Sequence, residues 1–398
     1  MKLAQRCSWI APSATMAMDT AAKEMARQGI DVISFGVGEP DFDTPENVKE
    51  AAIKAMKEGR TKYTPASGIH ELKVAIQQKL ARDNNLEYGI DQIAVTVGAK
   101  HALYNITQVL CDPGDEVIVP APYWVSYVEQ VRVTGATPVV IETTQENGFR
   151  VTPEQLREAI TPRTKAIMLN SPSNPTGAVY RREHLEPIAE IAVEKGIVVV
   201  SDEIYEPFIY GGAKHVSIAE LGPEIKALTL LVHGVSKSHA MTGWRIGYVA
   251  GDARVIKAIT SLQSHSTSNP VSIAQWAAVE ALTGSQEPVK QMVAEFAKRR
   301  EYLVERLRAL PGVECPMPEG AFYVFPRISA AFGKSYNGRV IQSSMDLCQL
   351  LLEEAHVSVV PGSAFGAEGY MRISYATSMA NLEKGMDRIE RIWRALVG

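Results

Sequence analysis

The sequence predicts an α/β protein with a large domain built on a mostly parallel seven-stranded sheet wrapped by helices, plus a smaller α+β domain. Through the middle of the chain, short apolar runs rich in β-branched residues alternate with longer segments of helical periodicity. Continuous apolar runs of this kind are typical of parallel strands buried on both faces. The chain has 398 residues, of which 46% are hydrophobic. A single core stops growing near ~250–300 residues, so two domains are expected.

Seven runs are expected to form the strands, and four longer segments between them are expected to form helices. The expected strands are residues 93–97, 116–119, 137–141, 166–169, 197–200, 227–232 and 246–249. The expected helices are residues 100–110, 123–134, 153–160 and 181–194. Pro153 supports the third helix, because proline suits a first helical turn and Thr152 before it is a good N-cap.

The pattern changes after about Pro288, where one long amphipathic helix is followed by short strands and two more helices. The strands are expected at residues 321–325, 357–360 and 371–374. Residues 1–45 contain too few apolar runs to fold alone, so they are expected to join this part. The sequence therefore predicts a large domain over residues 46–288 and a small domain of residues 1–45 and 289–398 with an N-terminal arm.

Composition excludes several classes of protein. The net charge of −4 gives no strong field that would recruit nucleic acid or anionic lipid. No run approaches ~18 apolar residues, so no membrane partner is expected. The four cysteines are far apart and form no CxxC pair, which favours reduced thiols in a cytoplasmic protein and no metal site. No GxSxG is present, and Gly36-Val37-Gly38 does not continue into GxGxxG, which disfavours a serine hydrolase and a nicotinamide dehydrogenase.

Lys237 follows the end of the expected strand 227–232, at the edge where open α/β sheets bind ligands. Alone, such a lysine is more often a solvated loop residue. With suitable partners it is an imine-forming nucleophile for an aldehyde cofactor. Asp202 directly follows the expected strand 197–200 and is either the N-cap of the next helix or the partner of a protonated pyridine nitrogen.

Other polar residues after strands could complete a cofactor site. Asn174 lies in a turn rich in proline, which is rigid with or without a function, and its amide could donate to a phenolate oxygen shared with Tyr205. The segment Gly98-Ala99-Lys100 opens a helix whose free amides can bind a phosphate, although it lacks the nucleotide P-loop signature. Arg245 and Ser236 could complete that phosphate site.

Two further residues have an ordinary and a functional interpretation. Arg372 lies in the short apolar strand 371–374, where a buried arginine needs an anion. That anion is either a structural carboxylate or the carboxylate of a substrate. Trp124 is either part of the core or a platform stacked on a flat ring.

Taken together, these residues resemble the fold-type I pyridoxal-phosphate enzymes, specifically the class I aminotransferases of the bacterial aspartate aminotransferase kind. The similarity covers nearly the whole chain and rests on seven motifs in the family's order. These are Gly36-Val37-Gly38-Glu39-Pro40-Asp41-Phe42, Lys62-Tyr63-Thr64-Pro65, Pro122-Tyr123-Trp124, Asn174-Pro175-Thr176-Gly177, Ser201-Asp202-Glu203-Ile204-Tyr205, Ser236-Lys237 through Arg245, and Arg372-Ile373-Ser374.

The resemblance implies that the large domain binds pyridoxal 5′-phosphate. Lys237 would form the imine and act as general base, Asp202 would pair with the ring nitrogen, and Trp124 would stack on the ring. Tyr205 and Asn174 would contact the phenolic oxygen. The phosphate would be held by Gly98, Ala99, Lys100, Ser236, Arg245 and, from the second subunit of a homodimer with shared active sites, Tyr63.

The resemblance also implies an amino-acid and a 2-oxo acid substrate, exchanged in a ping-pong cycle. Arg372 would bind the α-carboxylate, helped by Asn174, Trp124 and the backbone of Gly38.

One departure concerns the second carboxylate of a dicarboxylic substrate. In one branch of the family an arginine precedes a Ser-Asn-Pro, but here residues 264–270 contain none. The branch that this chain resembles can use Lys100 with Ser13 and Thr15, which favours aspartate and glutamate, with prephenate as an additional acceptor. Ser13 is equally explained as a helix N-cap.

Three alternatives remain open. They are an alanine or aromatic aminotransferase, a lyase of the same fold, and a regulator that keeps the cofactor site. The regulator is disfavoured, because the chain has no spare ~60–70 residues for a DNA-binding domain.

Overall fold

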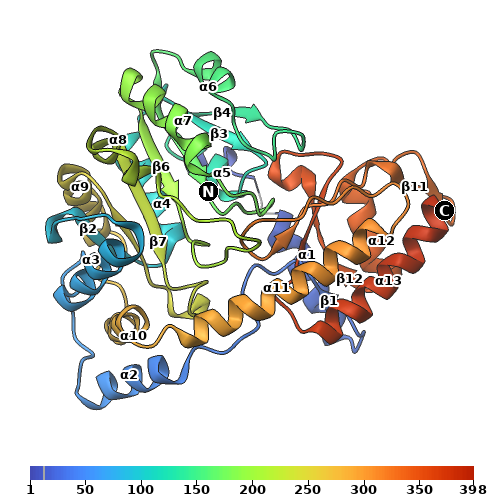
Figure 1. The fold of residues 1–398 in the computed structure, drawn as a ribbon, viewed down its shortest axis with the longest axis horizontal. Helices are drawn as coiled ribbons and strands as arrows, with labels where there is room; N and C mark the ends of the chain where they lie inside the picture. Colours follow the sequence, from blue (N-terminus) through green and yellow to red (C-terminus); the bar gives the residue numbers. More distant parts are fainter. Residues whose placement is uncertain (12–13) are drawn as a thin grey trace.

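A seven-stranded sheet lies at the centre of the larger part of the molecule (Figure 1). This computed structural model describes residues 1–11 and 14–398, without the side chains of residues 14–16 and 19. The strands are β2 (Ile93–Thr96), β3 (Glu116–Ala121), β4 (Thr137–Glu142), β5 (Thr164–Asn170), β6 (Val198–Asp202), β7 (Thr229–Gly234) and β8 (Gly247–Ala250). Their order is β2-β8-β7-β6-β5-β3-β4, and only β8 runs antiparallel to its neighbours. The predicted mostly parallel sheet is confirmed.

Both faces of this sheet are covered by helices, which explains why its strands are apolar throughout. In β7, Leu230 and Val232 pack on one face while Leu231 packs on the other, and all three are buried. The first face is covered by α4 (Ala99–Leu110), α5 (Ser126–Arg132) and α9 (Ala253–Ser264). The second face is covered by α2 (Glu46–Lys57), α3 (His70–Asn84), α6 (Pro153–Ala159), α7 (Arg182–Lys195), α8 (Pro223–Leu228) and α10 (Ser272–Thr283).

The helix limits follow local hydrogen bonds. Thr152 caps α6 as expected, because its hydroxyl accepts a hydrogen bond from the Gln155 backbone amide at 3.2 Å. In the opposite direction, the Thr152 backbone amide donates to the Gln155 side-chain Oε1 at 3.0 Å. Residues 123–134 were expected to be helical throughout, but α5 spans only Ser126–Arg132. The Tyr123 amide donates instead to the Phe365 carbonyl at 3.1 Å, far away in the sequence. A tertiary contact therefore replaces the first turn of that helix.

The smaller part is built from short strands and long helices. A three-stranded antiparallel sheet has the order β13 (Val360–Pro361), β14 (Met371–Ser374), β9 (Tyr323–Val324). Two pairs accompany it, β1 (Ile33–Ser34) with β12 (Val357–Ser358) and β10 (Ser335–Tyr336) with β11 (Arg339–Val340). The helices are α1 (Ala14–Arg27), α11 (Glu287–Arg308), α12 (Ser344–Ala355) and α13 (Met379–Val397). The expected single strand 357–360 is therefore two strands, because each half pairs with a different sheet.

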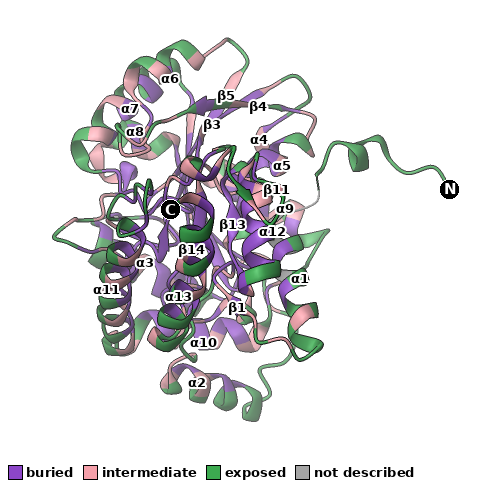
Figure 2. Cartoon of the chain, turned by 90° about the vertical axis from the view of Figure 1, so that its right-hand side faces the viewer, coloured by how far each residue is buried: buried purple, intermediate pink, exposed green. Residues whose placement is uncertain are grey.

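Helix α11 joins the two parts, starting beside α10 and running to α12 and α13 (Figure 1). Its Phe296 lies 5.7 Å from the Phe208 ring, which belongs to the segment after β6. Figure 2 shows the central strands buried and the outer helix faces exposed, with the first residues extending away from the body. Within residues 1–11 and 14–398, we find no helix that combines the length and apolarity needed to cross a membrane.

Candidate active site

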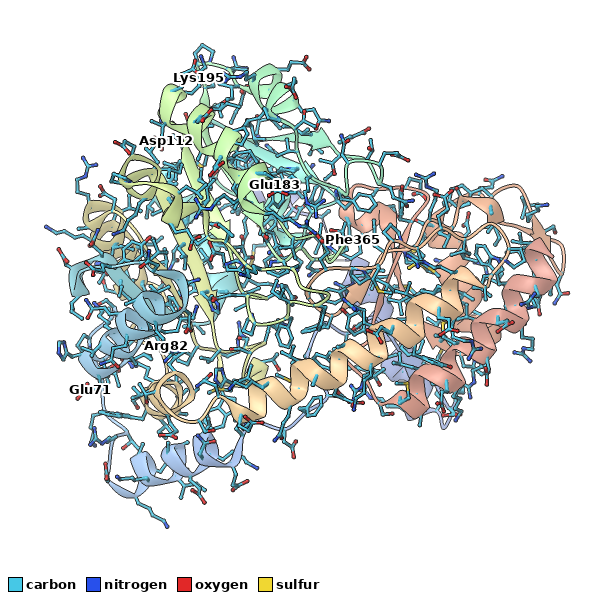
Figure 3. The ribbon with its side chains drawn as sticks, viewed as in Figure 1. Glu71, Arg82, Asp112, Glu183, Lys195 and Phe365 are labelled. Carbon is cyan, nitrogen blue, oxygen red and sulfur yellow. The ribbon has the colours of Figure 1, made fainter. Side chains whose placement is uncertain are left out.

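The carboxyl ends of β6 and β7, the start of α4 and strand β14 surround one cavity of about 390 Å³. Polar side chains from elements far apart in the sequence line it, as expected at this edge of an open α/β sheet. Phe365, labelled in Figure 3, lies where the two parts of the molecule meet. The sequence-predicted residues that line the cavity are Gly38, Ala99, Lys100, Trp124, Asn174, Asp202, Tyr205, Ser236, Lys237, Arg245 and Arg372.

Lys237 lies three residues beyond the end of β7, and its side chain enters the cavity. Its Nζ donates a hydrogen bond to the Gly38 carbonyl. Burial, together with the positive charges of Arg372 and Arg245, lowers the pKa of Lys237 to about 8, although Glu39 and Asp202 act in the opposite direction. Near pH 8 about half of this amine is therefore uncharged and nucleophilic.

Asp202 is the last residue of β6 and is buried. Its Oδ2 accepts from the Tyr127 hydroxyl at 2.7 Å, and its Oδ1 accepts from the Ile204 amide at 3.3 Å. Burial raises the pKa of Asp202 to about 6, and these two hydrogen bonds oppose the rise. No lysine or arginine of the described chain forms an ion pair with it. Asp202 is thus a buried acid that a cationic ligand would stabilise.

Asn174 and Tyr205 face the cavity with defined orientations. The Asn174 backbone amide donates to Asn170 Oδ1 at 2.7 Å. The Asn174 side-chain Oδ1 accepts from Arg372 Nη1 at 2.8 Å. That arrangement leaves the Asn174 side-chain NH₂ available as a donor. The Tyr205 hydroxyl lies 2.8 Å from the Tyr323 hydroxyl.

The Arg245 guanidinium and the start of α4 lie close together at the cavity. Arg245 Nη1 donates to the Thr242 carbonyl at 2.8 Å, and Nη2 donates to the Val97 carbonyl at 3.3 Å. Gly98, with φ of +82°, begins α4, and a Cβ there would lie only 2.3 Å from Arg245 Nη2. Two positive features therefore face each other across a contact that only glycine permits, which is the arrangement of an anion site.

Arg372 on β14 is buried without a carboxylate partner among the described residues. Its Nη2 donates to the Gly36 carbonyl at 2.6 Å, and its Nε has no partner in the described chain. The Arg372 Cζ lies 4.4 Å from the Tyr323 ring centroid and 5.1 Å from that of Phe365. Among the described residues we find no structural carboxylate bound to this arginine, and a buried guanidinium of this kind can bind the carboxylate of a ligand.

Lys100 and Trp124 also line the cavity. Lys100 Nζ lies 4.8 Å from the Trp124 ring centroid, and burial beside Arg245 lowers the pKa of Lys100. The Trp124 ring stands edge-on to Tyr127, with centroids 5.4 Å apart and planes at 83°. Trp124 lines the cavity, where an aromatic ring can stack on a flat ligand.

Two described residues of the prediction, Gly98 and Tyr63, are not among the residues that line the cavity, and two others lie outside the description. Tyr63 is 92% exposed and does not line the cavity of its own chain. Ser13 lies outside the described residues, and Thr15 belongs to α1 but its side chain lies outside the description.

The sequence did not predict several residues that line the cavity, among them Tyr127 and Tyr323. Tyr127 stands three residues after Trp124, on the same side of the expected helix, which was the available signal. Tyr323 lies within the expected strand 321–325, where an aromatic residue is ordinarily core.

Comparison with known proteins gives one consistent family. The family described as aminotransferase class I and II matches residues 30–389. The aspartate aminotransferase of Geobacillus stearothermophilus is 54% identical over 395 residues, which are 99% of this chain and 100% of that protein. A probable aspartate/prephenate aminotransferase of Aquifex aeolicus is 49% identical, over 98% of each chain.

Solved structures agree with these relatives. The aspartate aminotransferase from Rhizobium meliloti superposes with a TM-score of 0.96 at 46% identity, covering 100% of both chains. The Thermus thermophilus aspartate aminotransferase with maleate gives a TM-score of 0.93 at 47% identity, covering 98% of this chain and 100% of that one.

Proposed function

The chain belongs to the class I and II aminotransferases, and we propose that it moves the amino group between L-aspartate or L-glutamate and 2-oxoglutarate or oxaloacetate in a ping-pong cycle. The observation that carries the proposal is that Lys237, Asp202 and Arg372 line one cavity and form no ion pair with another described residue. An aldehyde could bind Lys237, a cation could pair with Asp202, and a carboxylate could pair with Arg372. The cofactor and the substrate of an aminotransferase would together provide these three groups.

The cofactor that the family implies is pyridoxal 5′-phosphate, and the cavity fits it. Asp202 is a buried acid without a cation, which suits a protonated ring nitrogen. Arg245 faces the start of α4 across Gly98, which suits a phosphate. Lys237 has a lowered pKa, which suits a covalent link to an aldehyde carbon.

We assign the cofactor contacts accordingly. Asp202 would hold the ring nitrogen, Tyr205 and Asn174 would donate to the phenolic oxygen, and Trp124 would cover one face of the ring. The phosphate would be held by the backbone at Gly98, Ala99 and Lys100, by the side chains of Ser236 and Arg245, and by Tyr63 of the partner subunit.

When bound there, the cofactor supplies an electron sink for the charge that develops at the substrate Cα. Lys237 Nζ, partly neutral near pH 8, would take the proton from the substrate Cα as general base. The negative charge of Asp202 would favour a protonated ring nitrogen, and Tyr127 and the Ile204 amide orient its carboxylate. Asn174 links the two ends of the cavity, since its Oδ1 accepts from Arg372 while its NH₂ stays free.

The substrate would lie between two cationic groups. Arg372 would bind the α-carboxylate through its fork of donors, assisted by Asn174, Trp124 and the backbone of Gly38. Lys100 would meet the second carboxylate, which is supported by its position beside Trp124 and by the lack of a carboxylate partner among the described residues. We assign Ser13 and Thr15 the same role on sequence resemblance alone.

Two lines of support favour acidic substrates. Relatives at about half identity are named aspartate aminotransferase, and some are named probable aspartate/prephenate aminotransferase. Prephenate carries a second carboxylate in addition to its 2-oxo acid, so the same pair of cations would accept it. We therefore propose prephenate as an additional acceptor.

We propose that the working unit is a homodimer that shares its active sites. Tyr63 is exposed, and apolar residues of the same region, Ile53, Met56 and Val271, are exposed as well. The first residues extend from the body in Figure 2, as an arm that embraces a second subunit would.

We also propose the division into a large domain of residues 46–288 and a small domain of residues 1–45 and 289–398. One hydrophobic cluster supports it, because Phe35 near the N-terminus packs with residues of α11, α12 and α13, and the only described residues of the large domain buried in that cluster belong to the segment after β6, such as Phe208. Since the four cysteines are free thiols, we propose a reducing compartment, the cytoplasm.

Replacement of Lys237 tests the proposed function. Lys237→Ala should lose the visible absorption that a lysine-bound cofactor gives, and should lose conversion of aspartate and 2-oxoglutarate at the same time. Lys195→Ala is the matched control, because Lys195 lies at the end of α7 far from the cavity (Figure 3) and should leave both properties unchanged. Transamination retained by Lys237→Ala would refute the assignment.

A further inference from the structure

Tyr323 on β9 lies against Tyr205, Arg372 and Gly38 in the cavity, although the proposed mechanism gives it no role. It is fully buried, and its hydroxyl lies 2.8 Å from the Tyr205 hydroxyl. Its ring face lies 4.4 Å from the Arg372 Cζ. A Cβ on Gly38 would come within 2.5 Å of the Tyr323 hydroxyl, so Tyr323 also packs directly against the segment whose carbonyl accepts from Lys237.

The direction of the hydrogen bond between the two tyrosines follows from a count of protons. Each hydroxyl has one proton to donate, and among the described residues each has only the other as a hydrogen-bond partner. If Tyr205 donates to the phenolic oxygen of the cofactor, its oxygen must accept from Tyr323. Burial raises the pKa of both groups, so both protons are present across the working pH range.

We propose that Tyr323 is a positioning residue that donates its proton to Tyr205 through its hydroxyl and fixes the Arg372 guanidinium with its ring. The inference rests on the proposed function, because it takes Tyr205 as the donor to the phenolic oxygen. Tyr323 comes from the small sheet and Tyr205 from the segment after β6, so this pair ties the carboxylate-binding strand to the cofactor-binding edge.

The hydroxyl and the ring have separable consequences. A donor that itself accepts a hydrogen bond is a stronger donor, so Tyr323 strengthens the bond from Tyr205 to the phenolic oxygen. That stabilises negative charge on the oxygen and favours the deprotonated form of the chromophore at lower pH. The ring acts on the guanidinium by a cation–π contact and by steric support, which affects carboxylate binding instead.

Two variants separate these contributions. Tyr323→Phe keeps the ring and removes the hydroxyl, whereas Tyr323→Leu removes both. Tyr375→Phe is the matched control, because Tyr375 is also fully buried in the small part and its hydroxyl donates to the Ala321 carbonyl at 3.1 Å, outside the cavity. Each holoenzyme is titrated with pH while its visible absorption is recorded, and its dissociation constant for succinate is measured.

Tyr323→Phe should raise the pH midpoint of the visible band by roughly 0.3–0.5 unit, with succinate affinity within about twofold of wild type. Tyr323→Leu should raise the midpoint similarly and weaken succinate binding by about fivefold or more. Tyr375→Phe should change neither quantity, even where it lowers the unfolding temperature as much as Tyr323→Phe does.

A midpoint that is unchanged or lowered in Tyr323→Phe would overturn the hydroxyl role. Succinate binding weakened equally in Tyr323→Phe and Tyr323→Leu would overturn the ring role. A wild-type protein without the visible band would contradict the proposed function itself, which distinguishes that failure from a failure of the Tyr323 inference.

Discussion

At the scale of single residues, the cavity concentrates charges that the described residues do not neutralise. Lys237 has a pKa of about 8 and Asp202 a pKa of about 6, both shifted chiefly by burial toward their neutral forms. Arg372 is buried, and its Nε has no hydrogen-bond partner in that part of the chain. Such groups destabilise the ligand-free fold, and we expect a bound cofactor and substrate to offset that cost.

Replacement of Lys237 tests how much its buried charge destabilises the cofactor-free protein. Because the folded-state pKa of about 8 lies below the ordinary 10.5, a charged Lys237 lowers the free energy of unfolding below pH 8. Lys237→Met should therefore raise that free energy at pH 7 by about 2 kcal/mol.

The stabilisation should shrink as pH rises from about 8 to 10.5, because wild type regains stability over that window. Urea unfolding of both apoproteins at several pH values measures the difference. A difference that is absent at pH 7, or constant with pH, would contradict the charge-burial account.

The sequence identified those residues whose chemistry is unusual for their position. Lys237, Asp202 and Arg372 were suspected because polar residues stood at the ends of strands or inside an apolar strand. Tyr127 and Tyr323 were not, since a tyrosine in an apolar segment is ordinarily core. Their partners, Asp202 and Tyr205, lie 75 and 118 positions away, so only the tertiary fold reveals the hydrogen bonds.

At the scale of elements, the phosphate site depends on the junction between β2 and α4. Gly98 adopts a φ of +82°, and Arg245 lies over it with a φ of +59°. Gly247 of β8 packs closely against the start of α4, because a Cβ added to Gly247 would lie 2.3 Å from the Ala99 amide nitrogen. Both glycines let the guanidinium, the strand and the helix start approach one another.

Gly98→Ala tests this junction. The new Cβ would collide with the Arg245 guanidinium and occupy a backbone conformation unsuited to alanine. We expect the apoprotein to bind pyridoxal 5′-phosphate about 10- to 100-fold more weakly, measured by fluorescence titration.

Gly243→Ala is the control for that substitution. Gly243 lies in the same segment as Arg245, but its added Cβ would meet no atom within 4 Å. Equal cofactor affinity in Gly98→Ala and wild type would argue against Arg245 and the α4 start as the phosphate site.

Most elements were predictable because their signals are local. All seven central strands were expected from apolar runs, and the Thr152 cap from two residues. The late start of α5 and the division of residues 357–360 between two sheets were not, because each depends on a partner distant in sequence. The order of the strands, with β8 between β2 and β7, likewise arises from tertiary pairing.

At the scale of the whole molecule, the exposed Tyr63 and the extended N-terminal residues support the proposed homodimer. Mixed dimers test whether the active sites are shared. Tyr63→Ala should impair the partner's phosphate site, while Lys237→Ala abolishes its own site.

Random reassociation of the two variants places half of the chains in mixed dimers, each with one intact cavity. Activity should therefore return to about a quarter of wild type after unfolding and refolding together. Co-refolding without any recovery would indicate that Tyr63 serves its own chain, and full activity of Tyr63→Ala alone would indicate that it serves neither site.

The central claim concerns an aminotransferase that uses acidic amino acids held between Arg372 and Lys100. The most direct measurement is the single-turnover reaction of the cofactor-loaded enzyme with a panel of amino acids, followed by its change in visible absorption. Aspartate and glutamate should react fastest, and Lys100→Met should lower their rate constants far more than that of alanine. A faster reaction of alanine or an aromatic amino acid with the wild-type enzyme would contradict the account.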